Sequence, residues 1–280
     1  MTVEIEHISQ SALDTWKKCQ QQGVFRYVMG LKIPSSMSMI QGKAFDKAES
    51  HNFAQKIKTQ EDVKLTVVQD VLHESFQEET RLRDVIIENE NIKPVEDEED
   101  APSYNEAESK ALASLKVFHE DQAGKIIPTS SQRKFSISLN GFEKPYSLDG
   151  VIDLEAKTAE GFEGIIDLKL KAKSMSVDEA NKSEQLTAYD AAVLAETGSH
   201  AKGVGLLATI KTKVPKVQFL SSSRTDEDTG RFLKGLGAVV RQVDLIKDGK
   251  LDPMPAPPGA WWCSKKFCGY WQFCKLRPKE

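Results

Sequence analysis

The 280-residue sequence has no long hydrophobic run, and its net charge is small. No stretch approaches the roughly 18 consecutive apolar residues that cross a bilayer, and the first ten residues have neither the basic start nor the apolar run of a secretory signal. We therefore expect a cytoplasmic protein without a membrane partner. The 38 basic and 42 acidic side chains give a net charge of −4, so the overall charge does not mark the chain as a nucleic-acid binder.

The charges are nevertheless unevenly distributed along the chain. Acidic residues are concentrated in residues 88–100, which we expect to form an exposed loop, whereas the second half is rich in lysine. Any phosphate-binding surface must therefore be local. Solvated lysines are the ordinary interpretation of such positions, but a DNA-binding groove is predicted near Lys171, Lys173, Lys211 and Lys213.

Hydrophobic periodicity divides the chain into four parts. Ser11 and Asp14 predict the capping box of a first helix that ends near Gly23. In the second half, strands with a hairpin turn at Asn140 and Gly141 surround a helix predicted over residues 177–197, which indicates an α/β fold with a mixed sheet. The predicted parts are N-terminal helices (1–59), a mostly helical insertion (60–125), the core (126–250) and a C-terminal tail (251–280).

Two charged residues end the very apolar strand predicted over residues 164–170. Asp167 and Lys169 are two positions apart, so in a strand they point to the same face. Asp153, on the preceding strand, lies across from Asp167 if the two strands pair as a hairpin. Two carboxylates can hold the hard cations that phosphodiester hydrolysis needs, and a nearby lysine can orient water or phosphate. Taken alone, however, an Asp-x-Lys tripeptide is more often a surface ion pair.

The next helix carries Gln185 and Tyr189 four positions apart, on one face. Alone, these would be ordinary surface and core residues. The order Asp153, Asp167-x-Lys169, Gln185-x-x-x-Tyr189 resembles the PD-(D/E)XK nuclease superfamily, in its RecB-like branch. The resemblance implies a restriction-endonuclease-like mixed β-sheet core flanked by helices, and DNA hydrolysis with Mg²⁺ or Mn²⁺. It also implies that the glutamine and tyrosine help to hold metal-bound water or DNA.

One position departs from that family. The family commonly has a glycine followed four residues later by a metal-binding histidine, whereas here Gly42 is followed by Asp46. Aspartate can bind a hard cation, although Glu49 or His51 on the same helix could take the role and Asp46 could be solvated. The implied metal-binding residues are Asp46, Asp153, Asp167 and Leu168.

The four cysteines are Cys19 in the first predicted helix and Cys263, Cys268 and Cys274 near the other end. In a cytosolic chain this arrangement favours a metal site over disulfides. It resembles the iron-sulfur nucleases of the same branch, AddB-type subunits and CRISPR-adaptation nucleases, which implies that these cysteines hold a [4Fe-4S] cluster. The late spacing C-x4-C-x5-C is wider than the usual C-x2-C-x5-C, so structural Zn²⁺ or unliganded thiols remain alternatives.

Six aromatic residues accompany the late cysteines, and two hypotheses describe them. They pack around the metal and exclude water, or some of them stack on nucleic-acid bases. These residues are Trp261, Trp262, Phe267, Tyr270, Trp271 and Phe273.

Together these features predict a metal-dependent DNA exonuclease acting in recombination, repair or phage DNA metabolism. DNA and a recombination or helicase protein are the expected partners. An exonuclease is preferred because a ring clasped by a cluster suits the threading of a DNA end, which is an argument by analogy. The alternatives are a non-catalytic DNA-binding or assembly subunit that keeps the fold and the cluster, and a zinc-stapled interaction module.

Overall fold

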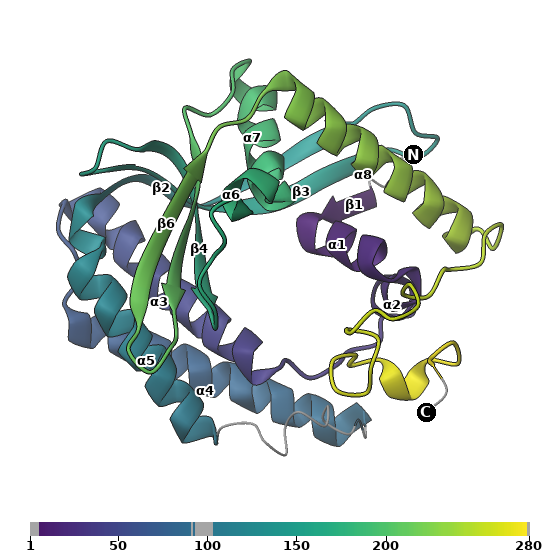
Figure 1. Cartoon of the computed structure of the whole chain (residues 1–280), viewed down its shortest axis with the longest axis horizontal. Coiled ribbons are helices and arrows are strands. Elements are labelled where there is room, and N and C mark those ends of the chain that lie inside the picture. Colours follow the sequence, from purple (N-terminus) through teal and green to yellow (C-terminus); the bar gives the residue numbers. More distant parts are fainter. Residues whose placement is uncertain (1–5, 91, 93–102, 279–280) are drawn as a thin grey trace.

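The computed structural model describes residues 6–90, 92 and 103–278. It is a mixed α/β structure in which helices flank one six-stranded sheet, as the sequence predicts (Figure 1). None of the described helices is long and apolar enough to cross a bilayer. The elements are β1 (Glu6–Ser9), α1 (Gln10–Lys18), α2 (Gln20–Gly23), the π-helical η1 (Val24–Val28), α3 (Met37–Thr59), α4 (Leu65–Glu90), α5 (Tyr104–Asp121), the 3-10 turn η3 (Ala123–Lys125), β2 (Ile126–Leu139), β3 (Tyr146–Thr158), β4 (Glu163–Lys171), α6 (Glu179–Lys182), α7 (Glu184–Thr197), β5 (Val204–Ile210), β6 (Lys216–Ser222), α8 (Asp226–Lys247) and the 3-10 turn η4 (Trp271–Phe273).

Strand β3 is the centre of the sheet. Along one edge it pairs with antiparallel β2 from end to end. Its other edge is shared, because β1 pairs in parallel with residues 146–149 and β4 pairs antiparallel with residues 154–157. β5 extends the sheet parallel to β4, and β6 is antiparallel to β5. The residues of β3 between its two partners therefore lie at a fork, where β1 and β4 diverge.

The sheet separates two hydrophobic cores. Helices α1, α7 and α8 pack on one face, α3 and α5 pack on the other, and α4 lies against α3 and α5. β3 contributes to both cores: Leu148 and Ile152 join the first, whereas Leu154 and Ala156 join the second. The strand passes from one core to the other at Asp153, so this charged residue lies at the boundary between them.

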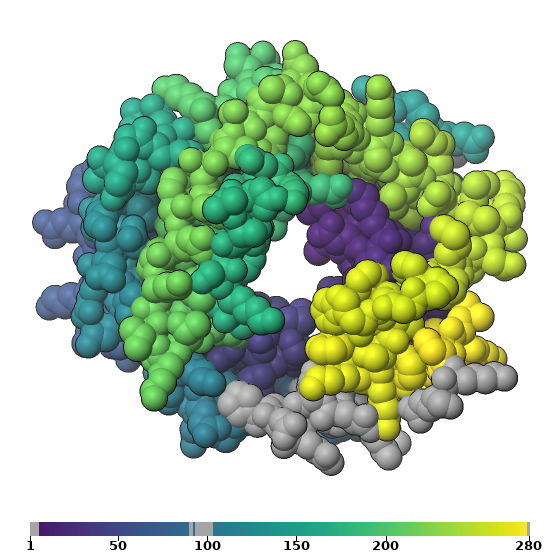
Figure 2. Space-filling model, viewed as in Figure 1, coloured from purple at the N-terminus to yellow at the C-terminus, as the bar shows by residue number. Residues whose placement is uncertain are grey.

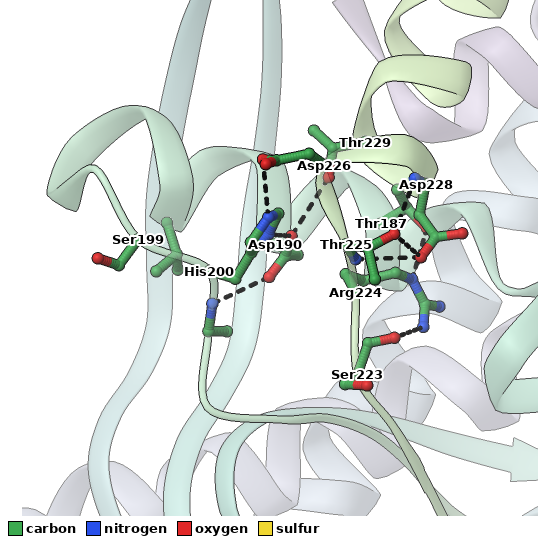
Figure 3. A network of polar contacts seen from close by, with 12 residues as sticks. Thr187, Asp190, Ser199, His200, Ser223, Arg224, Thr225, Asp226, Asp228 and Thr229 are labelled. Atoms are coloured by element: carbon green, nitrogen blue, oxygen red, sulfur yellow. Dashed lines mark hydrogen bonds and ion pairs between the residues drawn. The ribbon is translucent and has the colours of Figure 1, made fainter.

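A buried polar network joins α7 to the start of α8 (Figure 3). Asp190 of α7 is fully buried, and its carboxylate contacts His200 Nδ1 at 2.7 Å and accepts a bond from the Ala201 amide at 2.9 Å. Arg224 donates from Nε to Thr187 Oγ1 at 2.8 Å. Buried charges are tolerated when they are bonded in this way, so the network fixes the helices on this face.

The C-terminal tail folds onto the segment after α1. The amide of Gln21 donates to the carbonyl of Met254 at 3.2 Å, and the Met254 amide donates to Gln20 Oε1 at 2.9 Å. The rings of Phe25 and Tyr270 stack with centroids 5.6 Å apart. In the space-filling view an opening passes through the molecule, bordered by α1, α3, the segment that follows β4 and this tail (Figure 2).

The first predicted helix is wrong in two respects. Cys19 interrupts it in an extended conformation (φ −165°) between α1 and α2. The N-cap is Ser9, whose hydroxyl accepts a bond from the Ala12 amide, so Ser11 does not form the predicted capping box. At Cys19 the chain changes direction, and the residues that follow it, Gln20 and Gln21, bond to Met254 of the C-terminal tail.

Other predicted boundaries also shift. The helix predicted over residues 177–197 is split into α6 and α7, and α7 is capped by Ser183; its predicted end at Gly198 (φ 73°) is confirmed. Asn140 and Gly141 do not form a two-residue turn, because β2 and β3 begin to pair only at Leu139 and Tyr146, across the longer connection 140–145. The predicted acidic loop begins inside α4, and its part 91–100 lies outside the described residues except for Ile92.

Candidate active site and cysteine pocket

Asp167 and Lys169 lie on β4, between β3 and β5 in the sheet. The side chain of Asp167 is 0% exposed, whereas that of Lys169 is 37% exposed, and Lys169 Nζ contacts Asp167 Oδ1 at 2.8 Å. In the part of the chain that the structure describes, the second oxygen of Asp167, Oδ2, has no hydrogen-bond partner. Leaving a buried polar group unpaired costs about 1–3 kcal/mol, so this oxygen is a candidate ligand for a cation.

Asp153 lies beside Asp167, as the hairpin hypothesis predicts. The β3–β4 ladder ends with the pair Leu154 and Ile166, so Asp153 is the next residue, at the fork in the sheet. Beyond the last main-chain pair, the Asp153 side chain takes the place of a main-chain acceptor: its Oδ2 accepts a hydrogen bond from the Leu168 amide of β4 at 3.0 Å. This bond fixes the carboxylate of Asp153 on β3 next to the part of β4 that carries Asp167.

Three acids and one lysine interact electrostatically at this fork. Burial, followed by the charges of Asp167 and Asp46, raises the pKa of Asp153 to about 8. Burial also raises the pKa of Asp46, on α3, against the opposing effect of Lys169. Burial acts to lower the pKa of Lys169, but the carboxylates of Asp167 and Asp153 outweigh it, so that pKa rises. Added positive charge would stabilise such a cluster, because one ammonium does not balance three carboxylates.

The donor atoms are those that a hard divalent cation prefers. No three His, Cys, Asp or Glu side chains among the described residues form a ready-made metal group, so the acids are not drawn around one point. Leu168 packs its side chain in the core with α3, and its main chain contacts the site through the bond to Asp153. Carboxylate oxygens, one of them buried and unpaired on Asp167, fit Mg²⁺ or Mn²⁺ better than a softer metal.

Gln185 and Tyr189 lie one turn apart on α7, on the side of the acids. Gln185 Nε2 donates to the Tyr189 hydroxyl at 2.6 Å. Burial, followed by the charges of Asp153 and Asp167, raises the pKa of Tyr189, so its hydroxyl stays protonated. The structure therefore brings together six side chains that the sequence singles out: Asp46, Asp153, Asp167, Lys169, Gln185 and Tyr189.

Gln132 of β2 is a residue of this region that the sequence analysis misses. The β2–β3 register places it opposite Asp153, and its backbone is left-handed (φ 52°). Its Nε2 donates to Ser50 Oγ at 2.8 Å and to Asp46 Oδ1 at 3.5 Å, both on α3. A left-handed glutamine costs roughly 1–2 kcal/mol, so the fold holds it against strain. The available signal is the polar run at residues 129–134, which precedes the alternating part of the strand.

Glu49, an alternative ligand on α3, lies deeper than Asp46. It is fully buried, and neither of its oxygens finds a hydrogen-bond partner among the described groups. Burial, followed by the charges of Asp62 and Asp46, raises its pKa well above the ordinary value. His51, the other alternative, is half-buried. The charge of Asp46 raises the pKa of Asp153, so Asp46 is the better-placed ligand.

The four cysteines line one pocket between the α2 segment and the tail. All four are described, and none forms a disulfide. Cys19 and Cys268 are buried, and Gln22 Nε2 donates to Cys268 Sγ at 3.2 Å. Burial, followed by the charges of the other three thiols, raises the pKa of Cys263. Cys19, Cys263, Cys268 and Cys274, from which the sequence predicts a four-thiolate group, therefore lie around one pocket, but no three of them form a ready-made metal group among the described residues.

The chain was compared with known proteins. A crystal structure of a candidate exonuclease from Eubacterium rectale superposes with a TM-score of 0.57 at 12% identity, covering 98% of this chain and 90% of that one. That of a protein named SSO0001 gives a TM-score of 0.42 at 12% identity, covering 100% and 90%. No curated protein matches significantly. Residues 7–275 match the family described as the PD-(D/E)XK nuclease superfamily, and because this match spans nearly the whole chain, the protein belongs to that superfamily.

Proposed function

We propose that this nuclease is a Mg²⁺- or Mn²⁺-dependent DNA exonuclease of the RecB-like branch, acting in recombination, repair or phage DNA metabolism. The observation that carries the proposal is the electrostatic interaction of Asp46, Asp153 and Asp167 with Lys169, together with one buried oxygen of Asp167 that has no hydrogen-bond partner among the described residues. A charge-dense, half-accessible cluster of this kind marks a catalytic site more often than a structural one.

The three aspartates, with the main chain at Leu168, would hold the cation. When bound, Mg²⁺ or Mn²⁺ supplies positive charge against the phosphate and makes water more acidic. The Lys169 ammonium is fixed 2.8 Å from Asp167 and remains 37% exposed, so it can donate to a phosphate oxygen or orient the attacking water. Hydrolysis joins the water oxygen to phosphorus and breaks the bond to the leaving oxygen, which takes a proton.

Two features support an exonuclease acting on a DNA end. The opening in Figure 2 is bordered by the segment that follows β4, and β4 carries two of the proposed catalytic residues. Lys171 and Lys211 lie side by side at the ends of β4 and β5, since the Lys211 amide donates to the Lys171 carbonyl at 2.8 Å. Their ammonium groups already have partners, since Lys171 is ion-paired with Glu179 and Lys211 donates to Ser38 and Gln41. The exposed Lys173 and Lys213 beside them are the residues proposed to contact a phosphate backbone.

We further propose that Cys19, Cys263, Cys268 and Cys274 bind a [4Fe-4S] cluster, with structural Zn²⁺ as the alternative. The cluster would join the two ends of the chain, which already pack together around Phe25 and Tyr270. Iron, sulfide and zinc determination on anaerobically purified protein separates these alternatives. Residues 60–125, which contain α4 and α5, are proposed as an insertion that contacts a recombination or helicase partner.

A non-catalytic DNA-binding or assembly subunit is the second candidate. The observation that favours it is Asp46, which stands where the family commonly has a histidine. Burial raises the pKa of this carboxyl, which disfavours the deprotonated form that binds a cation.

The deciding experiment measures cleavage of end-labelled linear DNA, single- and double-stranded, against covalently closed circles with Mg²⁺ or Mn²⁺. We expect degradation of linear DNA only, abolished in Asp167→Asn and retained in Asp149→Asn, a matched change at a β3 carboxylate that binds Ser136. Cleavage that survives Asp167→Asn would refute the assigned site. Absence of cleavage on every substrate, with the cysteine metal intact, would favour the non-catalytic subunit.

A further inference from the structure

The six aromatic residues of the tail do not share one environment. Trp262, Tyr270 and Trp271 line the pocket with the four cysteines. Trp261, Phe267 and Phe273 are instead 64%, 47% and 36% exposed. The packing hypothesis therefore accounts for three of the six residues and leaves one tryptophan and two phenylalanines partly or largely exposed. Clustered large apolar side chains on a surface usually mark a binding site.

Trp261 and Phe267 form a fixed pair. Their ring centroids are 4.9 Å apart at an interplanar angle of 89°, and Trp261 meets Trp262 edge to face at 5.8 Å. The intervening chain is held by tight turns, since Ser264 Oγ donates to the Trp261 carbonyl at 3.0 Å and the Phe267 amide donates to the Ser264 carbonyl at 3.1 Å. Trp262 is anchored in the cysteine pocket, so the exposed rings stand on a rigid base.

The surroundings of this pair are basic. Residues 260–278 contain Lys265, Lys266, Lys275 and Arg277 and no acidic residue. Lys18 lies over the Trp262 ring at 5.7 Å from its centroid, and Lys266 lies over Phe267 at 5.8 Å. Flat rings with cations beside them match a flexible polyanion that carries flat bases, which is single-stranded nucleic acid. A duplex keeps the faces of its internal bases stacked on one another, so it offers no free base face to a protein ring.

We propose that Trp261 and Phe267 form a base-stacking platform for single-stranded DNA, an inference that rests on the proposed function. The tail that carries them borders the opening (Figure 2). The platform gives the proposed exonuclease a preference for a single-stranded end. The platform is joined directly to the cysteine pocket, because Trp261 is followed by Trp262 and Cys263, which line that pocket.

The test measures binding without cleavage, on the full-length protein carrying Asp167→Asn and its native metal content. Three probes of equal length are titrated anaerobically: oligothymidylate, an abasic strand with the same phosphates, and a blunt duplex. We expect Trp261→Ala and Phe267→Ala to weaken oligothymidylate binding about 5- to 100-fold, and to leave the abasic strand and the duplex within about twofold. Trp261→Phe should restore most of the affinity, because a flat ring is kept.

Phe273→Ala is the matched control, since Phe273 is an exposed ring of the same tail that lies outside the pair. Iron or zinc content and the melting temperature establish that each variant keeps the pocket. Equal losses for oligothymidylate and the abasic strand, or no loss in Trp261→Ala, would overturn the platform. This binding assay does not depend on catalysis. If the protein without Asp167→Asn cleaves no DNA but the assay still shows tighter binding to oligothymidylate than to the abasic strand, the proposed function is refuted and the platform is retained.

Discussion

In metal-free protein, the substitution Asp153→Asn is expected to stabilise the fold at about pH 8 and to have little effect at about pH 4. The folded protein raises the pKa of Asp153 from 3.8 to about 8, through burial and then the charges of Asp167 and Asp46. A raised pKa means that the folded state binds the proton more tightly than the unfolded state. The stability that this proton contributes is therefore complete below about pH 4 and is lost as the pH rises towards 8.

The size of the effect follows from that difference. A pKa change from 3.8 to about 8 corresponds to roughly 6 kcal/mol at most. Asp153 is half-buried and lies near Lys169, so screening reduces the difference to about 1–3 kcal/mol. Because an asparagine at position 153 carries no charge at any of these pH values, the variant does not lose stability when the pH rises towards 8.

The assay is urea unfolding of chelator-treated protein at several pH values, repeated with Mg²⁺ or Mn²⁺. The cation should stabilise the wild type strongly at about pH 8 and weakly at about pH 5.5, because binding requires deprotonated carboxylates. The variant should gain much less from it. Asp149→Asn is the control of opposite sign: burial opposes the change, but bonds from Ser136 and Ser147 lower the pKa of Asp149, so its neutralisation should reduce stability above pH 4.

Destabilisation of metal-free Asp153→Asn at pH 8 would refute the reasoning, since it would show that the charged form is favoured without a cation. Equal stabilisation of wild type and variant by Mg²⁺ would place the cation elsewhere.

Three further predictions concern neighbouring residues. Lys169→Met should reduce initial cleavage rates by about 100-fold or more while DNA affinity changes little. Lys134→Met, at an exposed lysine of β2, is the control, and full activity of Lys169→Met would show that Lys169 takes no part in the mechanism. Gln132→Gly should be more stable than Gln132→Ala by about 1 kcal/mol in urea unfolding, because glycine adopts φ 52° without strain, and equal stabilities would contradict the strained backbone. Asp190→Ala should cost about 2–4 kcal/mol, because the bonds to His200 and the Ala201 amide are lost. The hydrogen bond to Asp190 raises the pKa of His200, so this cost should shrink as the pH rises above that pKa, and a cost that grows with pH would disprove it.

Much of the fold follows from local patterns in the sequence. β5 is buried along its whole length, and the sequence shows it as a run of apolar residues and glycine with Thr209 as its one polar residue. α8 begins with a local signal, because Thr225 and Asp228 form a capping box at its start. The first helix could not be predicted in the same way. Its break at Cys19 depends on contacts with a tail more than 230 residues away, which no local pattern records.

The residues of the candidate site also differ in whether local sequence patterns predict them. Asp153 and Asp167 could be placed together because strand pairing fixes which residues face each other, and the observed ladder keeps that register. Gln132 could not, because its contribution depends on a left-handed backbone that the sequence does not mark with glycine. Hydrogen bonds to Ser50 and Asp46 hold that conformation, and both partners lie on a helix some 80 residues earlier in the chain.

The position of Asp153 also explains why this fold can hold several acids. A carboxylate within either hydrophobic core would be strongly disfavoured without a partner. At the fork, β3 leaves one core for the other and its edge is not fully paired, so a side-chain oxygen can take the place of a main-chain acceptor, as Asp153 does with the Leu168 amide. The same gap leaves Lys169 partly exposed beside a fully buried Asp167. The break in the sheet therefore makes the charged cluster tolerable and at the same time accessible to substrate.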